Sequence, residues 1–263
     1  MMGELFVKTL RDMRGALLGW STGLALFGLL AMSFWPQIGG AEDFDQWWEG
    51  MPEAMRNAFG GAPSVTTLEG YLDSQVWALM PLIASIVGIM WGSRLIAGEQ
   101  QDRTVDLLMS QPIRRRDVVL EKGLALASLV LVLFVAMWIG LVVGGLLVGE
   151  GLPLLDTLLA TMLGVLPAWA VAFVTFLASA EAQTRKTAVL VGTVFVGVSW
   201  LVTSFFPLVD LLEPVTGISI LHWYSGREIM LDGGGLGLLV PLVLTIVAWG
   251  LAVWRFEKKD ILV

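Results

Sequence analysis

Long apolar segments alternate with shorter polar segments along the chain of 263 residues. A helix needs about 20 mostly apolar residues to cross a hydrocarbon core of roughly 30 Å. Six segments reach this length with no Asp, Glu, Lys, Arg or His inside their bounds. The pattern therefore predicts an all-α, polytopic membrane protein, a single transmembrane domain over 1–263 with six transmembrane helices. The predicted spans are 16–37, 75–93, 123–148, 157–178, 187–209 and 236–254.

The segments outside the spans differ in character. Residues 1–15 place their apolar side chains within about 80° of one another in a helix, with charged side chains opposite. This pattern predicts an amphipathic elbow helix in the membrane interface, with Phe6 and Leu10 on its apolar face; a plain leader with basic anchors is the alternative. The segments 38–74 and 210–235 are predicted to be outer loops. The apolar set is Met2, Phe6, Leu10 and Met13, and the charged set is Glu4, Lys8 and Arg11.

The composition agrees with the bilayer as solvent and removes several kinds of chemistry. Hydrophobic residues make up 56% of the chain and charged residues 15%, against about 45–50% and about 25% in soluble proteins. The chain has no cysteine and one histidine, His222, which excludes thiolate and poly-histidine metal sites. No GxxxxGK[ST] phosphate loop occurs. We expect no catalytic, metal or cofactor site here, so any ATP must bind to another chain.

The basic residues fall mainly on one side of the predicted topology. With the N-terminus inside, all but two of the 16 Lys and Arg residues lie in inner segments, the exceptions being Arg56 and Arg227. The positive-inside rule then predicts a multi-pass protein of the cell membrane with both termini in the cytoplasm. The residues expected to anchor this topology at the inner interface are Arg115, Arg116, Lys122, Lys258 and Lys259.

The segment 98–117, between the second and third predicted spans, is rich in charge. In a helical conformation Glu99, Asp102 and Asp106 fall on one arc, and acidic residues are favoured near a helix N-terminus. Pro112 is expected to end this helix. A solvated loop that only enforces topology is the alternative, but a helix resting on anionic lipid would carry mainly Lys and Arg. The acidic pattern therefore predicts a protein partner.

The same segment contains a spaced set of residues, Gly98, Glu99, Thr104, Leu107, Leu108, Gln111, Pro112, Arg114 and Lys122. This set resembles the cytoplasmic motif of ABC-2 type transporter permeases, which often reads approximately GEExxGTLxLLLSxPxSRxxxxxxK. The run 69–72 and the ending 256–261 also resemble that family, so the resemblance covers essentially the whole chain. Several positions depart from the family's usual pattern. Gln100 and Gln101 stand in place of acidic residues, and Arg103 stands in place of a glycine.

The resemblance implies the permease subunit of an ATP-driven exporter. Such a subunit pairs with a second permease, identical or related, and with two separate ATP-binding subunits that hold the ATP and Mg. The segment 98–117 would then be a cytoplasmic coupling helix seated on the ATPase, and no nucleic acid is expected as a partner. The expected ATPase contacts are Glu99, Asp102, Arg103, Thr104, Asp106, Leu107, Leu108, Pro112 and Arg114, supported by the elbow residues Phe6 and Leu10.

Other classes of function remain open at this stage. An ATP-independent carrier or channel would move substrate without a partner, although ion-coupled carriers usually keep ionisable groups inside their spans. A membrane assembly or anchoring factor would bind a partner without transporting anything. The sequence does not identify the substrate.

Overall fold

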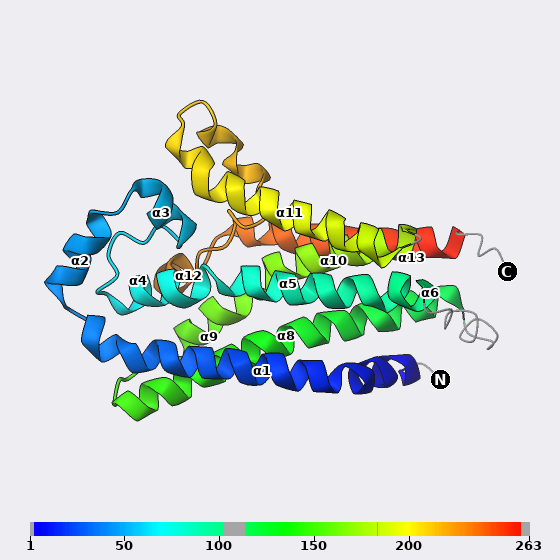
Figure 1. The fold of residues 1–263 in the computed structure, drawn as a ribbon, viewed down its shortest axis with the longest axis horizontal. Coiled ribbons are helices and arrows are strands. Elements are labelled where there is room, and N and C mark those ends of the chain that lie inside the picture. Colours follow the sequence, from blue (N-terminus) through cyan, green and yellow to red (C-terminus); the bar gives the residue numbers. More distant parts are fainter. Residues whose placement is uncertain (1–2, 102–113, 183, 259–263) are drawn as a thin grey trace.

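The computed structural model of the protein describes residues 3–101, 114–182 and 184–258 (Figure 1). Throughout these ranges the regular structure is helical, without strands. Within them, six helical segments are long and apolar enough to cross a membrane. Each overlaps one predicted span, so the all-α fold with six transmembrane helices is confirmed. The segments are Glu4–Ile38, Leu68–Gly98, Arg115–Val148, Leu154–Glu181, Arg185–Leu208 and Leu236–Lys258.

Two spans are single long helices and the other four are built from shorter pieces. The single helices are α1 (Glu4–Ile38) and α8 (Arg115–Val148). The second span joins α4 (Leu68–Leu72), the π-helix η1 (Asp73–Trp77), α5 (Met80–Ser93) and the π-helix η2 (Arg94–Gly98), and α6 (Glu99–Gln101) follows it. The remaining spans contain α9 (Leu154–Leu163) with α10 (Val165–Glu181), α11 (Arg185–Phe205) with η3 (Phe206–Leu208), and η5 (Leu236–Leu238) with α13 (Leu239–Lys258).

The bundle has two distinct ends. The start of α1, the end of α13 and α6 lie together at one end, here called the terminal end (Figure 1). The opposite end, here called the far end, carries the short helices α2 (Glu42–Glu49), α3 (Glu53–Ala58) and α12 (Gly226–Asp232), together with η4 (Glu213–Ile218). The predicted outer loops 38–74 and 210–235 therefore share the far end.

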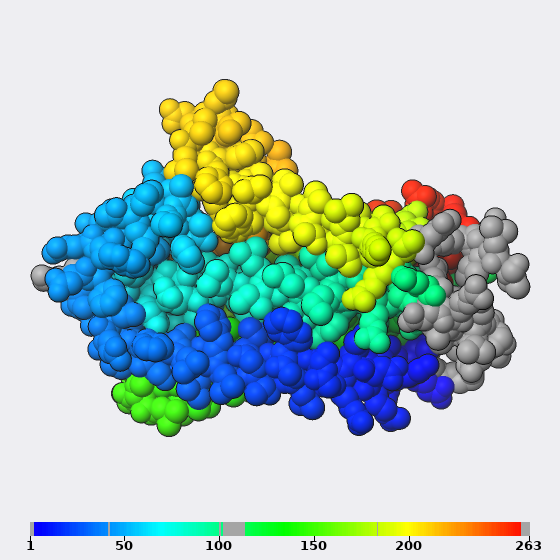
Figure 2. Space-filling model, viewed as in Figure 1, coloured from blue at the N-terminus to red at the C-terminus, as the bar shows by residue number. Residues whose placement is uncertain are grey.

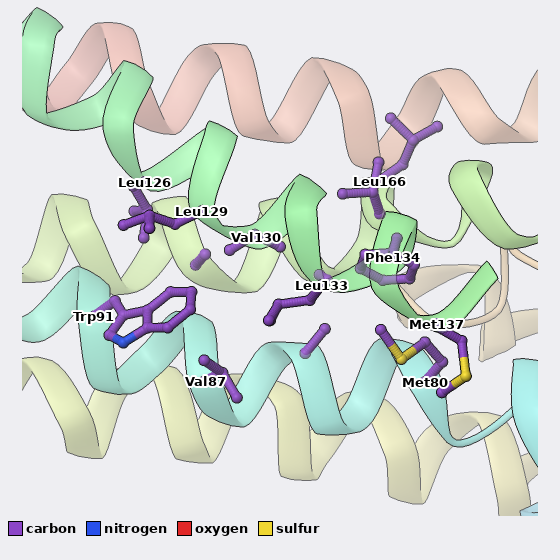
Figure 3. Packing of buried hydrophobic residues seen from close by; sticks show 14 of the residues in the cluster. Met80, Val87, Trp91, Leu126, Leu129, Val130, Leu133, Phe134, Met137 and Leu166 are labelled. Carbon is purple, nitrogen blue, oxygen red and sulfur yellow. The ribbon is translucent and has the colours of Figure 1, made fainter. Parts of the chain in front are cut away.

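The core lies around α5 and α10, the most buried of the spans. Helix α10 packs against α5, α11 and α13, and α5 also packs against α8. Figure 3 shows Met80 and Trp91 of α5 and Leu133 and Met137 of α8 pointing toward one another, and all four are almost fully buried. Large apolar side chains fill the interior of the bundle.

The outer surface of the bundle is also apolar. Figure 2 shows one face formed by α1, α5 and α11. On α1, the side chains of Leu18, Leu26, Leu30 and Phe34 are each more than half exposed and repeat at intervals of four or eight residues. An apolar stripe this long would be unfavourable in water, and it is what a helix facing lipid tails requires.

Glycines bring α1 and α8 into close contact. A Cβ atom added at Gly140 would lie 2.0 Å from the carbonyl oxygen of Ala25, and one added at Gly144 would lie 2.8 Å from that of Leu29. Both neighbours are backbone atoms, which cannot rotate away as a side chain could. The small residues therefore set how near the two helices pack.

Replacing Gly140 tests this contact, with Gly19 of α1 as the matched control. Gly140→Ala should lower the free energy of unfolding by about 1–3 kcal/mol, because the added methyl group overpacks the contact. Gly19→Ala meets nothing within 4 Å and should leave stability unchanged or raise it by up to about 1 kcal/mol. Thermal unfolding in detergent measures both variants. Equal effects would show that the close approach is not needed.

The N-terminal segment differs from its prediction. The elbow helix expected over residues 1–15 does not appear as a separate helix, because Glu4–Ile38 runs without interruption. No proline lies near residue 15, and one helical glycine such as Gly15 costs only about 1 kcal/mol, so nothing there forces a break. Phe6 is partly buried. Leu10 is also partly buried and packs against the core of the bundle.

The fourth span is broken at Gly164, between α9 and α10. The amide of Gly164 donates to the carbonyl of Thr161, which leaves the carbonyl of Ala160 without its usual helical partner. The Tyr224 hydroxyl donates to that carbonyl instead, at 2.9 Å. Pro167 then lies in the first turn of α10, where its missing amide costs little. The loop that carries Tyr224 is thereby fixed to the fourth span.

Candidate functional site

The residues of the predicted coupling region are only partly described. Asp102, Arg103, Thr104, Asp106, Leu107, Leu108 and Pro112, and the anchor Lys259, lie outside the described residues. Of the residues named for this region and its anchors, the structure describes Glu99 in α6, Arg114 just before α8, and Arg115, Arg116 and Lys122 in the first turns of α8. The predicted coupling helix itself therefore stays a prediction.

Lys122 forms a buried contact with the start of that region. Only 3% of Lys122 is exposed. Its Nζ donates to the carbonyl of Leu95 at 2.7 Å and forms an ion pair with the carboxylate of Glu99. The sequence had suggested only a topology anchor for Lys122. The structure adds a link between α8 and the segment η2–α6.

Glu121, the neighbour of Lys122, holds the N-terminus of α1. Its two carboxylate oxygens accept hydrogen bonds from the amides of Gly3, at 2.9 Å, and Phe6, at 3.0 Å. The first amides of a helix have no partner inside the helix, and the helix dipole favours a negative charge beside them. Two successive residues of α8 therefore secure two different segments, α1 through Glu121 and α6 through Lys122.

Ser179 of α10 is inserted into the backbone of η2. Its hydroxyl donates to the carbonyl of Ser93 at 3.2 Å and accepts from the amide of Ala97 at 2.8 Å. These two backbone groups are four residues apart, and in an α-helix they would bond to each other. The inserted hydroxyl separates them and accounts for the wider π turn. Because η2 leads directly into α6, Ser179 helps set the direction in which Glu99 leaves the bundle.

A basic cavity of ≈ 720 Å³ lies beside this junction. Arg94, Arg185 and Lys186 contribute its positive charges. The guanidinium of Arg185 donates to the Ser93 hydroxyl at 3.3 Å and to the Met90 carbonyl at 3.4 Å, which ties the start of α11 to the second span. Positive charge is thus concentrated next to the point where the chain enters the coupling region.

Two features of the described residues bear on metal binding and on serine chemistry. Among them, no group of three or more His, Asp or Glu side chains lies close enough to hold a metal ion. The run 19–23 has the GxSxG spacing of a serine nucleophile turn, but it lies inside the continuous helix α1, whereas that turn joins a strand to a helix. The polar side chains at the terminal end instead hold the helices in position and connect them to one another.

Sequence reasoning missed Glu121 and Ser179. Their partners are more than 80 residues away in sequence, and neither residue belongs to a periodic pattern. For Glu121, the available signal was its place beside Lys122 at the mouth of a span. Ionisable side chains at the end of a span are costly unless each has a partner. The neighbouring Glu121 and Lys122 could therefore both have been expected to bind a partner group.

The predicted anchors Arg116 and Lys258 are exposed, and their role at an interface stays a prediction. Lys258 lies over the ring of Trp254, with its Nζ 4.2 Å from the ring centroid. Lysine and tryptophan side chains are both common where a helix leaves the hydrocarbon core. Their place at the terminal end matches the predicted anchors, while the side of the membrane stays a prediction.

Comparison with known proteins identifies one family. A family model described as ABC-2 family transporter protein matches residues 53–261, from α3 through the last span. The match includes η2, the coupling region and Lys122. The chain matches none of the curated proteins with which it was compared.

The ion pair predicts a charge-reversal effect. Lys122→Glu would place a buried carboxylate beside that of the partly exposed Glu99 and should lower the free energy of unfolding by about 3 kcal/mol or more. The double variant Glu99→Lys/Lys122→Glu should recover part of this loss. Thermal unfolding of the purified chain measures the effect.

Arg14→Glu is the control for this experiment, because Arg14 is an exposed residue near the terminal end of α1. It should change stability by no more than about 0.5 kcal/mol. If Lys122→Glu behaves like Arg14→Glu, or if the double variant recovers nothing, the two charges do not depend on each other.

Proposed function

The chain belongs to the ABC-2 family of transporter proteins, and from this premise we propose that it is the permease subunit of an ATP-driven exporter. Family membership makes it a membrane component of an ABC transporter, which is a transport subunit and not itself a catalyst. The proposal adds the direction of transport, the coupling to ATP and the partner chains. We propose two permeases, identical or related, with two ATP-binding subunits that hold ATP and Mg.

The observation that carries the proposal is the ion pair between the buried Lys122 and the partly exposed Glu99. It occurs at the entry to the segment that resembles a coupling helix, and it joins that segment to a long membrane-spanning helix. A solvated loop that only enforced topology would not need a buried lysine paired with a carboxylate at its root. The contact supports the proposal that this segment transmits movement from a partner protein to the membrane-spanning helices.

The mechanism follows from what the terminal end connects. ATP binding closes the two ATP-binding subunits and moves the coupling helices seated on them. Through Glu99 and Lys122 the movement reaches α8, and through Glu121 it reaches the N-terminus of α1. Ser179 connects the same junction to α10, at the centre of the bundle. The spans then rearrange and open a path for the substrate at the interface of the two permeases.

The proposed orientation places the terminal end in the cytoplasm. The basic residues of the inner segments, among them Arg114, Arg116 and Arg255, lie at this end together with the start of α1 and the end of α13. Such a bias is typical of cytoplasmic segments. The protein would then lie in the cell membrane with both termini in the cytoplasm.

Co-expression with the ATP-binding subunit encoded beside this chain tests the proposal. The two proteins should co-purify, and reconstituted vesicles should show substrate movement only with ATP. Asp102→Arg/Asp106→Arg should lower the amount of co-purified ATPase at least about tenfold, because reversed charges oppose the partner surface. Asp43→Arg/Glu49→Arg reverses two exposed charges at the far end and should leave assembly unchanged.

Three outcomes would overturn parts of this proposal. Failure of any ATP-binding subunit to co-purify would remove the permease assignment. Flux through vesicles that contain this chain alone would favour an ATP-independent carrier or channel. Unchanged assembly of the Asp102→Arg/Asp106→Arg variant would remove these two residues from the contact.

A further inference from the structure

Two adjoining cavities open at the far end of the bundle. The first, of ≈ 270 Å³, lies between α3, the start of the second span, the end of α11 and the segment 221–228. The second, of ≈ 340 Å³, lies between α3 and the end of α11. Ala58 and Trp200 line both, so the two cavities adjoin, and together they are here called the double cavity. Ligand pockets typically measure about 300–1,000 Å³; the second cavity falls within this range and the first lies just below it.

The first cavity is acidic. Asp73 and Glu228 line it, and among its described lining residues there is no Lys or Arg. Asp73 is 3% exposed and accepts a hydrogen bond from the amide of Arg227 at 3.1 Å. The guanidinium of Arg227, which does not line the cavity, interacts electrostatically with the carboxylate of Asp73. Glu228 is exposed. The other ionisable side chains of the described lining are those of His222 and Tyr224.

The second cavity is apolar and partly aromatic. Its lining includes Pro52, Met55, Trp200 and Phe205. The rings of Trp200 and Phe205 meet edge to face, with centroids 6.1 Å apart. Met55 is 53% exposed and Phe205 42%, so this surface is accessible at the far end. An aromatic face beside an acidic cavity favours a cation that also has an apolar body.

Hydrogen bonds hold the polar wall of the first cavity in place. The Thr203 hydroxyl donates to that of Ser219 at 2.6 Å, and Ser219 donates to the carbonyl of Ser199 at 2.7 Å, which fixes the segment before His222 to α11. Burial raises the pKa of Tyr224 well above its ordinary value, and the charge of Asp73 adds to the effect. The phenol therefore stays neutral and donates to Ala160.

Hydrogen bonds also fix the loop that carries α3. The carboxylate of Asp45 accepts hydrogen bonds from the hydroxyls of Thr66 and Ser64 and from the amide of Val65. The bonds from Thr66 and Ser64 lower the pKa of Asp45. Trp48, which is buried, donates its indole N–H to the carbonyl of Ala62 at 2.7 Å. Both walls of the double cavity are therefore formed before any ligand arrives, as is usual for ligand sites.

We propose that the double cavity is a binding site for amphipathic organic cations. The cationic group lies in the first cavity near Asp73 and Glu228, and the apolar body lies against Trp200 and Phe205 in the second. Carboxylates in a recessed site attract a cation, and the aromatic surface discriminates against small hydrated ions. This inference rests on the geometry of the far end and does not depend on ATP or on a partner chain.

Binding to the full-length chain in lipid nanodiscs tests the inference. The probe is radiolabelled tetraphenylphosphonium, and tetraphenylborate is the anion of the same shape. After subtraction of the signal from empty nanodiscs, the cation should bind saturably and the anion should not. Glu228→Gln and Trp200→Ala should each weaken binding of the cation about tenfold, as expected for the loss of one charged or aromatic contact.

Glu213→Gln is the matched control, because Glu213 is exposed at the far end and does not line either cavity. It should leave binding unchanged. Glu228 is exposed, so Glu228→Gln should leave the fold intact, and it is used in place of a variant of the buried Asp73. The inference is overturned if the cation shows no saturable binding, if the anion binds equally well, or if Glu228→Gln and Trp200→Ala both bind like the wild type.

Discussion

Lys122 places an ammonium group inside the terminal end of the bundle, and the packing there depends on its neutralisation. A buried ammonium without a partner costs several kcal/mol, so the carboxylate of Glu99 and the carbonyl of Leu95 must stay within reach. The segment η2–α6 cannot leave α8 without exposing or unpairing that charge. Glu121 imposes a similar constraint on α1 by holding the amides of Gly3 and Phe6. The starts of α1 and α8 and the end of the second span are therefore linked to one another.

The two ends of the molecule have different chemistry. At the terminal end, basic side chains surround a junction whose polar groups bond mainly to one another and to the backbone, an arrangement suited to passing movement from a partner into the spans. At the far end, Asp73 and Glu228 face a hollow whose walls are held by Asp45, Ser219 and Tyr224. Between the ends, α5 and α10 form an apolar core in continuous contact. A movement that enters at η2 has a packed route along α5 to the start of the double cavity.

The sequence predicted the general architecture well, because hydrophobic length and charge bias are local properties. The six spans and the shared end of both termini follow from them. The contacts that organise the ends could not be predicted. Glu121, Ser179 and Asp73 each bond to a backbone group more than 80 residues away, and no local pattern encodes such a distance. The elbow helix was expected from seven residues of periodicity, but α1 continues because nothing near Gly15 interrupts it.

The central claim is that the link between Glu99 and Lys122 transmits movement as a rigid connection. The chain has no cysteine, so Glu99→Cys/Lys122→Cys can be joined specifically by a short thiol crosslinker in the complex with the ATP-binding subunit. ATP-dependent transport in vesicles is then measured before and after crosslinking. The account predicts that the unlinked variant loses transport, since the ion pair is gone, and that crosslinking restores it. Transport that is unaffected in the unlinked variant, or that crosslinking does not restore, would contradict the claim.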